Sequence, residues 1–371
     1  MRRSMMSDRT SDNRSGRLQG VAAAPGRRFR GPLLWCAILL APLVSTADDH
    51  ATILVYHHVA DDTPSSTSVT PQQFSEHLDY LVANDYRVLP VEQILEHLAE
   101  RRPLPENSIA ITFDDAYLSV YKIARPMLDA RDMPYSVFVS TESIDHGYGN
   151  YMSWEQLRST TEYGGSIGNH GTKHQSALAR GHNESREDWL ERFRQDAVQA
   201  QARIQAETGS HPVIYAWPYG EYNAEVQGVL DELGWHGLGQ QSGPAGFDDP
   251  KTAVPRFPIS GSYADMDAFA LRVRSEPLPV EVTNAPDRLL ATGRPAPKLE
   301  FRLRDGPYAL DTVDCFNSQG ARLDTETSDS GTLAVRSPSA LSTGRSKYTC
   351  TAPHQAKSGV FGWYSHLWVV K

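Results

Sequence analysis

Cysteine is scarce in this sequence. Three Cys residues occur among 371, which is too few for a disulfide framework to take the place of a hydrophobic core. Hydrophobic residues make up 40% of the chain; this is enough to bury such a core and excludes wholesale disorder. The length predicts one large domain with a smaller one, or two medium domains.

Basic residues are fewer than acidic ones beyond residue 47. Residues 1–47 carry eight Arg and two Asp, a local charge of +6, whereas the whole chain carries −9. Residues 48–371 therefore carry −15. Binding to phosphates requires a positive surface, so this acidity argues against nucleic acid as a partner.

The N-terminal apolar run, residues 33–44, is shorter than the roughly 20 residues of a membrane-spanning helix. It follows the arginines and precedes the small residues 45–47, an order typical of an export signal. We therefore interpret residues 1–47 as an export signal, with an uncleaved N-terminal anchor as the alternative. In both cases we expect the rest of the protein to work in the periplasm, outside the cell or in the cell envelope.

Removal of the export signal would also remove one of the three cysteines. Cleavage after Ala47 would discard Cys36 and leave Cys315 and Cys350. An even pair in an oxidising compartment predicts a disulfide bond. Two buried thiols are the alternative.

Short apolar runs alternate with helical periodicity from residue 51 onward. Residues 53–56, 109–113 and 135–139 are predicted as buried strands, while Phe74 and Leu78 begin a helical repeat. Strands that alternate with helices predict parallel βα units, closed as a barrel or left open as a sheet.

The alternation stops before a Pro-rich segment. Residues 277–298 contain five prolines, a composition typical of a linker, and residues 299–371 contain short strand-like runs separated by Gly, Ser and Asp. We therefore expect a small β domain at residues 299–371, of unknown role. Its period-2 pattern places Tyr364, His366 and Trp368 on one face, either as a row that stacks on sugars or as a buried strand.

Two adjacent carboxylates follow a buried strand at Asp114 and Asp115. Ligands gather at the C-terminal ends of strands in βα folds. Two carboxylates are costly to place there unless a metal ion or a proton compensates them, and adjacent side chains diverge, so one can bind a cation while its neighbour does different chemistry. A helix N-cap is the alternative.

Two histidines, His170 and His174, are four residues apart. That spacing would place both on one face of a helical turn. Two imidazoles and one carboxylate form a three-ligand set that leaves coordination positions open, as in catalytic zinc sites. A pair of surface histidines is the alternative.

Further polar and aromatic residues follow other predicted strands. Trp217, Pro218 and Tyr219 close one strand, where backbone N–H groups of the turn would point into a site and the aromatic rings would face sugars. A core-packed aromatic turn is the alternative. His57 and His58 follow the first strand, where one would act as a general acid or serve as a structural histidine.

Together these motifs resemble the polysaccharide deacetylase (NodB-homology) family, carbohydrate esterase family four. Residues 112–115 match its first motif, and residues 170–174 match the second, with Gly171 where Ser or Thr is usual. Residues 217–220 contain the Pro-Tyr-Gly of the third motif. The resemblance covers about residues 51–260.

The sequence also departs from the family pattern. The third motif usually has an arginine two positions before the proline, where this chain has Ala216. Arg256 is the residue that would replace the orienting role of that arginine. The late Leu-x-His motif is not recognisable. The histidines after the first strand and the altered third motif are most similar to the poly-β-1,6-N-acetylglucosamine N-deacetylase-like branch.

The resemblance implies an α/β fold for residues 48–276: a (β/α) barrel, distorted or seven-stranded as in NodB-homology domains. The small all-β domain expected from the residue pattern follows it. It implies hydrolysis of N-acetyl groups from an N-acetylglucosamine-containing polysaccharide, with release of acetate. The alternatives are a non-catalytic glycan-binding protein on the same scaffold, or an O-acetyl esterase or peptidoglycan deacetylase. The expected partner is an acetylated polysaccharide, with association to the cell envelope left open.

The resemblance also implies roles for individual residues. A divalent metal ion, for which Zn²⁺ is the best match to nitrogen and oxygen ligands, would be held by Asp115, His170 and His174. Asp114 would act as general base and His57 as the acid. Contacts with the substrate are expected from Trp217, Pro218, Tyr219 and Arg256.

Overall fold

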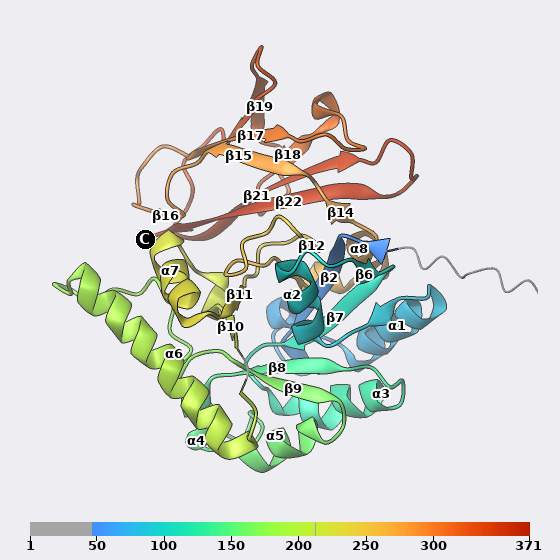
Figure 1. Cartoon of the computed structure of the whole chain (residues 1–371), viewed down its shortest axis with the longest axis vertical. Coiled ribbons are helices and arrows are strands. Elements are labelled where there is room, and N and C mark those ends of the chain that lie inside the picture. Colours follow the sequence, from blue (N-terminus) through green and yellow to red (C-terminus); the bar gives the residue numbers. More distant parts are fainter. Residues whose placement is uncertain (1–46, 212) are drawn as a thin grey trace, which may run out of the picture. The chain divides into compact units, whose positions relative to one another are not determined.

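The computed structural model describes residues 47–371 apart from residue 212 (Figure 1). The predicted export signal therefore lies, except for residue 47, outside the described residues. Among the residues described, no helix is both long enough and apolar enough to cross a membrane.

A curled nine-stranded sheet forms the first part of the described chain. The path through it is β11-β10-β9-β8-β7-β2-β12, with β13 paired to β2 and β5 paired to β7. Most neighbours are parallel, and β12 is antiparallel to β2. The strands are β2 (His50–Tyr56), β5 (Arg87–Val88), β7 (Ser108–Phe113), β8 (Tyr135–Val139), β9 (Gly165–Asn169), β10 (Ile214–Ala216), β11 (His236–Leu238), β12 (Ala245–Gly246) and β13 (Phe257–Pro258).

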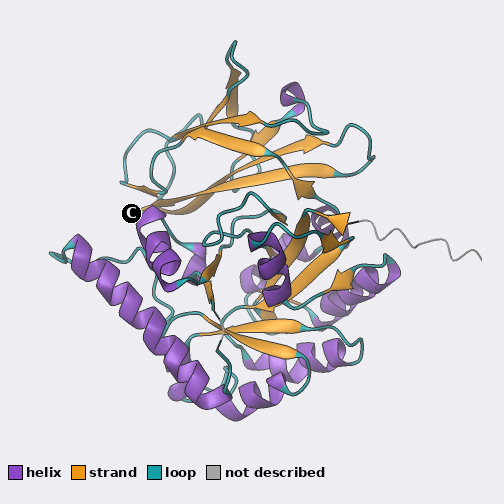
Figure 2. Ribbon diagram, viewed as in Figure 1, coloured by secondary structure: helices purple, strands orange, loops and turns teal. Residues whose placement is uncertain are grey.

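Helices cover this curled sheet (Figures 1 and 2). Residue Thr70 caps the first of them as expected for a Thr-Pro start: its Oγ1 accepts from Gln73 N at 3.1 Å, and Phe74 and Leu78 are buried. The helices are α1 (Pro71–Ala83), α2 (Val91–Ala99), the π-helical turn η2 (Val120–Ala124), α3 (Arg125–Asp129), α4 (Thr141–Asp145), α5 (Trp154–Thr161), α6 (Arg186–Thr208), α7 (Ala224–Leu233) and α8 (Met266–Val273).

All residues of β7 and β8 are buried, as expected for parallel strands covered on both faces. Short elements complete this region: β1 (Ala47–Asp48) pairs with β6 (Leu104–Pro105), and β3 (His58–Val59) pairs with β4 (Ser68–Val69). Short 3₁₀ turns are η1 (Ser65–Thr67), η3 (Pro218–Gly220) and η4 (Gly261–Ala264).

One short segment, residues 254–259, connects the two ends of the parallel strand series. Val254 bridges to Leu238 of β11, and β13 pairs with Leu54 and Val55 of β2. Arg256 lies between these two contacts. The curled sheet is thus a distorted (β/α) barrel, which confirms the predicted fold class, and its closing segment carries Arg256.

Two smaller sheets form the C-terminal part of the chain. One has the order β14-β22-β21-β18 with β16 also paired to β22, and the other has the order β15-β17-β20-β19. Side chains of both sheets share one core, including Phe301, Val335 and Trp368. The elements are β14 (Glu276–Pro277), β15 (Val280–Asn284), β16 (Leu289–Leu290), β17 (Lys298–Leu303), η5 (Leu310–Thr312), β18 (Asp314–Phe316), β19 (Asp324–Thr327), β20 (Leu333–Arg336), β21 (Gly344–Pro353) and β22 (Phe361–Val370).

We call this all-β part the β sandwich. Trp368 is fully buried in its core and His366 is 5% exposed, so the buried-strand interpretation holds for both. Cys315 and Cys350 face each other on β18 and β21, with their sulfurs 2.05 Å apart.

The segment with the composition of a linker, residues 277–298, contains paired strands. β15 pairs with β17, and β16 pairs with β22. Proline is compatible with this pairing because all five prolines of the segment lie outside β15 and β16. Strand pairing of the β sandwich thus begins at Glu276, where β14 meets β22.

Candidate active site

The predicted metal ligands converge at the C-terminal ends of β7 and β9. Asp115 follows β7, and His170 and His174 follow β9. His174 Nε2 lies 3.1 Å and His170 Nε2 3.5 Å from Asp115 Oδ1, and the three ligand atoms lie within 4.8 Å of one another. One carboxylate and two imidazoles at this spacing suit a divalent metal such as zinc.

The prediction that a helical turn brings the two histidines together is wrong. Residues 170–174 form an irregular loop in which Gly171 has φ 79° and His174 has φ 52°. A Cβ at residue 171 would lie 2.8 Å from Asp196 Oδ2, which explains why glycine replaces the usual Ser or Thr. Asp115 also has a left-handed backbone, at φ 72°. Such conformations cost about 1–3 kcal/mol each in non-glycine residues and cluster at functional sites.

His170 is held in one orientation by the next strand. It is fully buried, and its Nδ1 lies 2.7 Å from the backbone oxygen of Ala216. Nδ1 therefore donates to that carbonyl, which leaves Nε2 as the nitrogen with a free lone pair. Nε2 is buried without a hydrogen-bond partner in the described structure, and it faces Asp115. A metal ion fits this orphaned nitrogen.

The electrostatics of the other two ligands also suit a metal ion. Burial, with His170 beside it, lowers the pKa of His174 to about 4, so His174 is neutral at pH 7. Burial opposes the charge of Asp115, but the neighbouring imidazoles, His170 first among them, outweigh it and lower the pKa of Asp115. Metal ligation requires a neutral imidazole and an ionised carboxylate.

Asp114 is paired with Arg256. Arg256 Nη1 and Nη2 donate to Asp114 Oδ1 and Oδ2, each at 2.8 Å, and both side chains are fully buried. Arg256 is itself fixed by a bond from its Nε to the oxygen of Gly239 at 2.8 Å. Burial would raise the pKa of Asp114, but Arg256 outweighs that effect and the pKa is lowered. The carboxylate is therefore ionised at pH 7.

His57 lies between β2 and β3, near both carboxylates. Burial lowers its pKa, while the charges of Asp114 and Asp115 act in the opposite direction. His58 stacks on Tyr117, with ring centroids 3.6 Å apart. Of these two histidines, His57 is thus the one in the electrostatic environment of Asp114.

In the third motif, Trp217 and Pro218 lie in the core, whereas Tyr219 lies at the site. Trp217 is fully buried, its Nε1 donates to Thr252 O at 2.9 Å, and its ring packs on Phe193. The predicted sugar contact of Trp217 is therefore contradicted, because core packing leaves no exposed face. Pro218 is likewise buried in the turn η3. Tyr219 is 42% exposed, and its ring lies 4.4 Å from that of His174, so it borders the metal-ligand triad.

One residue at the site was not identified from the sequence. Gln240 Nε2 donates to Asp114 Oδ2 at 3.3 Å. It follows β11 and belongs to no motif with a recognisable spacing. Only the position of β11 at the edge of the parallel strand series brings it near the carboxylate.

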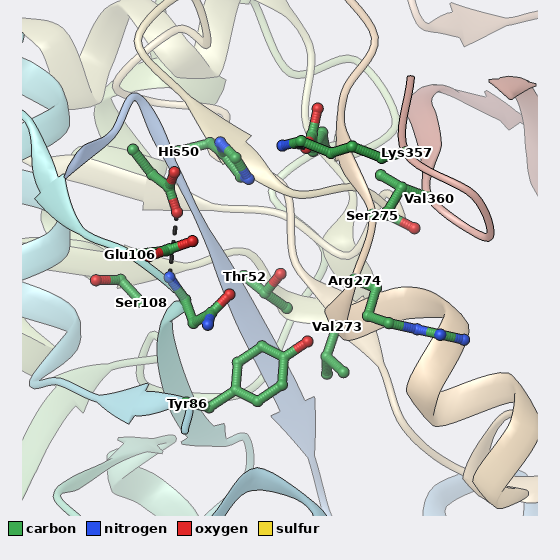
Figure 3. A pocket seen from close by; sticks show the side chains of 13 residues that line it. His50, Thr52, Tyr86, Glu106, Ser108, Val273, Arg274, Ser275, Lys357 and Val360 are labelled. Atoms are coloured by element: carbon green, nitrogen blue, oxygen red, sulfur yellow. Dashed lines mark hydrogen bonds and ion pairs between the residues drawn. The ribbon is translucent and has the colours of Figure 1, made fainter. Parts of the chain in front are cut away.

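A separate cavity lies at the amino ends of β2 and β7, where Figure 3 shows His50, Thr52 and Ser108 with Tyr86 and Lys357 around it. The metal-ligand triad follows the opposite ends of the strands. Among the described residues, Asp115, His170 and His174 are the group with ligand atoms close enough to hold a metal ion.

A curled βα sheet thus carries one carboxylate and two histidines at the carboxyl ends of its strands, with a second carboxylate beside them. Comparison with known proteins agrees with the resemblance that the motifs indicate. The family described as polysaccharide deacetylase matches residues 101–238, so the chain contains a polysaccharide deacetylase domain, which confirms the predicted resemblance.

Two proteins that are similar to this chain in sequence are named as deacetylases. The Bacillus subtilis protein YxkH, provisionally named a polysaccharide deacetylase, is 26% identical over 226 residues, covering 60% of this chain and 76% of that protein. The poly-beta-1,6-N-acetyl-D-glucosamine N-deacetylase of Escherichia coli K12 is 25% identical over 217 residues, covering 48% of this chain and 32% of the enzyme. The match thus spans about a third of the length of that E. coli relative.

Solved structures share the fold. A Streptococcus pyogenes deacetylase in complex with acetate has a TM-score of 0.55 at 19% identity, over 62% of this chain and 99% of that one. IcaB from Ammonifex degensii has a TM-score of 0.52 at 24% identity, over 61% and 97% of the two chains. Both agree with the distorted barrel described above.

Proposed function

We propose that this protein hydrolyses N-acetyl groups of an N-acetylglucosamine-containing polysaccharide and releases acetate. The observation that carries the proposal is the convergence of Asp115, His170 and His174 beside Asp114, a buried carboxylate held ionised by Arg256. The name of the E. coli relative supports the choice of sugar. The predicted export signal supports a site of action outside the cytoplasm.

A divalent ion fits the triad, and we propose Zn²⁺ held by Asp115, His170 and His174. When bound, such an ion supplies Lewis-acid activation of the acetyl carbonyl and of water. The protein contributes the pre-oriented His170, whose Nδ1 is fixed on Ala216, and a neutral His174.

Asp114 would act as general base. Its carboxylate would accept a proton from the attacking water, while Arg256 and Gln240 hold its two oxygens in place. Addition of the water oxygen to the acetyl carbon forms the tetrahedral intermediate, whose oxyanion would be stabilised by the backbone N–H of Tyr219. Cleavage of the C–N bond then releases acetate, and the proton that Asp114 accepted would pass to the departing sugar amine by way of His57.

The non-catalytic alternative loses its main support. It rested on Ala216 in place of the usual arginine, but Arg256 supplies a guanidinium to Asp114 from the closing segment, residues 254–259. A chain that binds glycan without hydrolysis has no need of an ionised base beside three metal ligands.

Acetate release provides the test. Purified protein stripped of metal should lose hydrolysis of N-acetylglucosamine oligomers and regain it with zinc. A panel of chitin, β-1,6-linked and peptidoglycan oligomers would identify the polymer, and O-acetylated sugars would test the esterase alternative. Full activity of Asp114→Asn would contradict the role of the base.

A further inference from the structure

Arg345, at the start of β21 in the β sandwich, contacts the edge of the candidate active site. Its Nη1 donates to the backbone oxygen of Tyr219 at 2.7 Å and lies 3.4 Å from Gln240 Oε1. Its guanidinium carbon lies 5.8 Å from the centre of the Tyr219 ring. The β sandwich therefore contacts two residues that border Asp114 and His174.

The contact with Gln240 determines how that amide is oriented. An ionised carboxylate can only accept hydrogen bonds and a guanidinium can only donate them. Gln240 must therefore present Nε2 to Asp114, at 3.3 Å, and Oε1 to Arg345. With Arg345 absent, the amide loses the partner that holds its oxygen away from the carboxylate.

The contact with Tyr219 fixes a strained turn. Tyr219 has φ 60°, in the left-handed region that non-glycine residues rarely adopt. Gly220 follows at φ 68°, so close to Gln240 that a Cβ on residue 220 would lie 2.7 Å from Gln240 Cβ. Turn and glutamine thus form one packed unit, and Arg345 bonds to both parts of it.

A second cation contacts the same region from the neighbouring strand. Arg345 pairs in register with Val369 of β22, so Lys371 lies at the same end of the β21–β22 pair. Lys371 Nζ is 3.4 Å from Glu221 Oε2 and 3.3 Å from Ser176 Oγ. This end of the sandwich therefore contacts both the loop after His174 and the loop after Tyr219.

We propose that Arg345 is a positioning residue for the deacetylation reaction, supplied by the β sandwich. It holds the Tyr219 turn, and through Gln240 the base Asp114, in the geometry that the reaction requires. This inference rests on the proposed function and assigns the β sandwich a part in the active site.

The test compares three variants of the full-length, zinc-loaded protein. Arg345→Ala removes both contacts. Arg345→Lys keeps the charge and one donor nitrogen but lacks the planar fork of arginine. Arg336→Ala, at the exposed last residue of β20 in the other sheet, is the matched control. Acetate release from N-acetylglucosamine oligomers gives kcat and KM, and hydrogen exchange reports the mobility of residues 217–221.

We expect Arg345→Ala to lower kcat about tenfold or more, as for small misplacements of reacting groups, with a smaller change in KM. Arg345→Lys should lie between Arg345→Ala and wild type, and Arg336→Ala should match wild type. Exchange at residues 217–221 should become faster in Arg345→Ala alone, with zinc affinity unchanged.

Equal kcat and equal exchange for Arg345→Ala and Arg336→Ala would overturn the proposal. A loss of activity accompanied by loss of zinc binding would also overturn it, because the substitution would then act through the metal ligands rather than through Tyr219 and Gln240. Absence of acetate release from the wild-type protein would instead reject the proposed function. In that case the exchange comparison would still show whether Arg345 holds the Tyr219 turn.

Discussion

Arg256 and Asp114 form a buried ion pair between residues far apart in the sequence. Neither side chain has any exposed surface, and the guanidinium binds both carboxylate oxygens at 2.8 Å. A buried pair of this kind contributes little net stability compared with apolar residues, but removal of one partner leaves an uncompensated charge. Both the stability of the fold and the ionisation of the candidate base therefore depend on Arg256.

Arg256→Ala should lower the free energy of unfolding by about 3–5 kcal/mol and abolish acetate release. Urea denaturation checks the first effect. The double variant Arg256→Ala/Asp114→Ala should be less destabilised than the sum of the two single variants, because it buries no unpaired charge. Strict additivity would contradict the coupling.

Asp249 predicts a dependence of stability on pH. Its carboxylate accepts from Gly246 N at 2.8 Å, and burial raises its pKa to about 7, above the value of about 3.9 in an unfolded chain. The folded state therefore binds more protons between these values, and the stability contributed by the protonated group is lost as pH rises from about 4 to 7.

Asp249→Asn keeps an oxygen that can accept from Gly246 but removes the charge. The variant should match wild type near pH 4 and unfold at a higher temperature near pH 8. Thermal unfolding at constant ionic strength measures this difference. A melting-temperature difference that stays constant from pH 4 to pH 8 would contradict a raised pKa.

At the scale of elements, regular buried strands and the motifs at their ends were predictable. Runs of apolar residues identify β2, β7 and β8 in the sequence, and Asp114 and Asp115 follow β7. β9 was not predicted because its pattern is masked by glycine. A Cβ at Gly168 would lie 2.3 Å from Phe138 Cε1, so the strand needs glycine for close packing even though glycine is a poor strand former.

Contacts made by short segments could not be predicted either. β13 is two residues long, and no periodicity identifies a pair of residues as the segment that closes a barrel. The proposal that Arg256 replaces a missing arginine therefore started from the family pattern rather than from strand prediction. Gln240 and Arg345 had no such pattern, because tertiary contacts alone bring them to Tyr219 and Asp114.

Two glycine-to-alanine variants, one in the turn η3 and one outside it, test the packing of that turn. Gly220→Ala adds a methyl group at φ 68°, 2.7 Å from Gln240 Cβ. We therefore expect the free energy of unfolding to fall by about 1–3 kcal/mol, and acetate release to fall by more than this loss of stability explains. Gly228→Ala lies in α7, where a Cβ meets nothing within 4 Å, and should stabilise the protein by about 0.5–1 kcal/mol. Unfolding midpoints and acetate release of both variants measure the contrast. Equal effects would contradict the packing described for η3.

At the scale of the molecule, the barrel and the β sandwich share apolar packing. Leu367 and Val369 of β22 belong to the same buried cluster as Trp217 and Tyr222. Trp217 is thus part of the contact between the two parts rather than a platform for sugar. The sandwich is accordingly packed against the motif that carries Tyr219.

Net charge predicts how the protein responds to its product. Residues 48–371 carry −15, and deacetylation would convert neutral amides into cationic amines. We expect affinity for the deacetylated polymer to exceed that for the acetylated one at low salt, and to fall as salt screens the attraction. Binding of both polymers at about 20 mM and 500 mM NaCl tests this expectation. Product affinity that is unchanged by salt would contradict it.

The closing segment, residues 254–259, determines the order in which the parts of the site can form during folding. Until Val254 and β13 have docked on the two strands that they connect, Asp114 has no guanidinium partner. A chain with an unclosed barrel would therefore lack the two contacts that orient its base, whatever the state of its metal ligands. During refolding, the recovery of acetate release would report the closure of the barrel rather than the formation of its earlier strands.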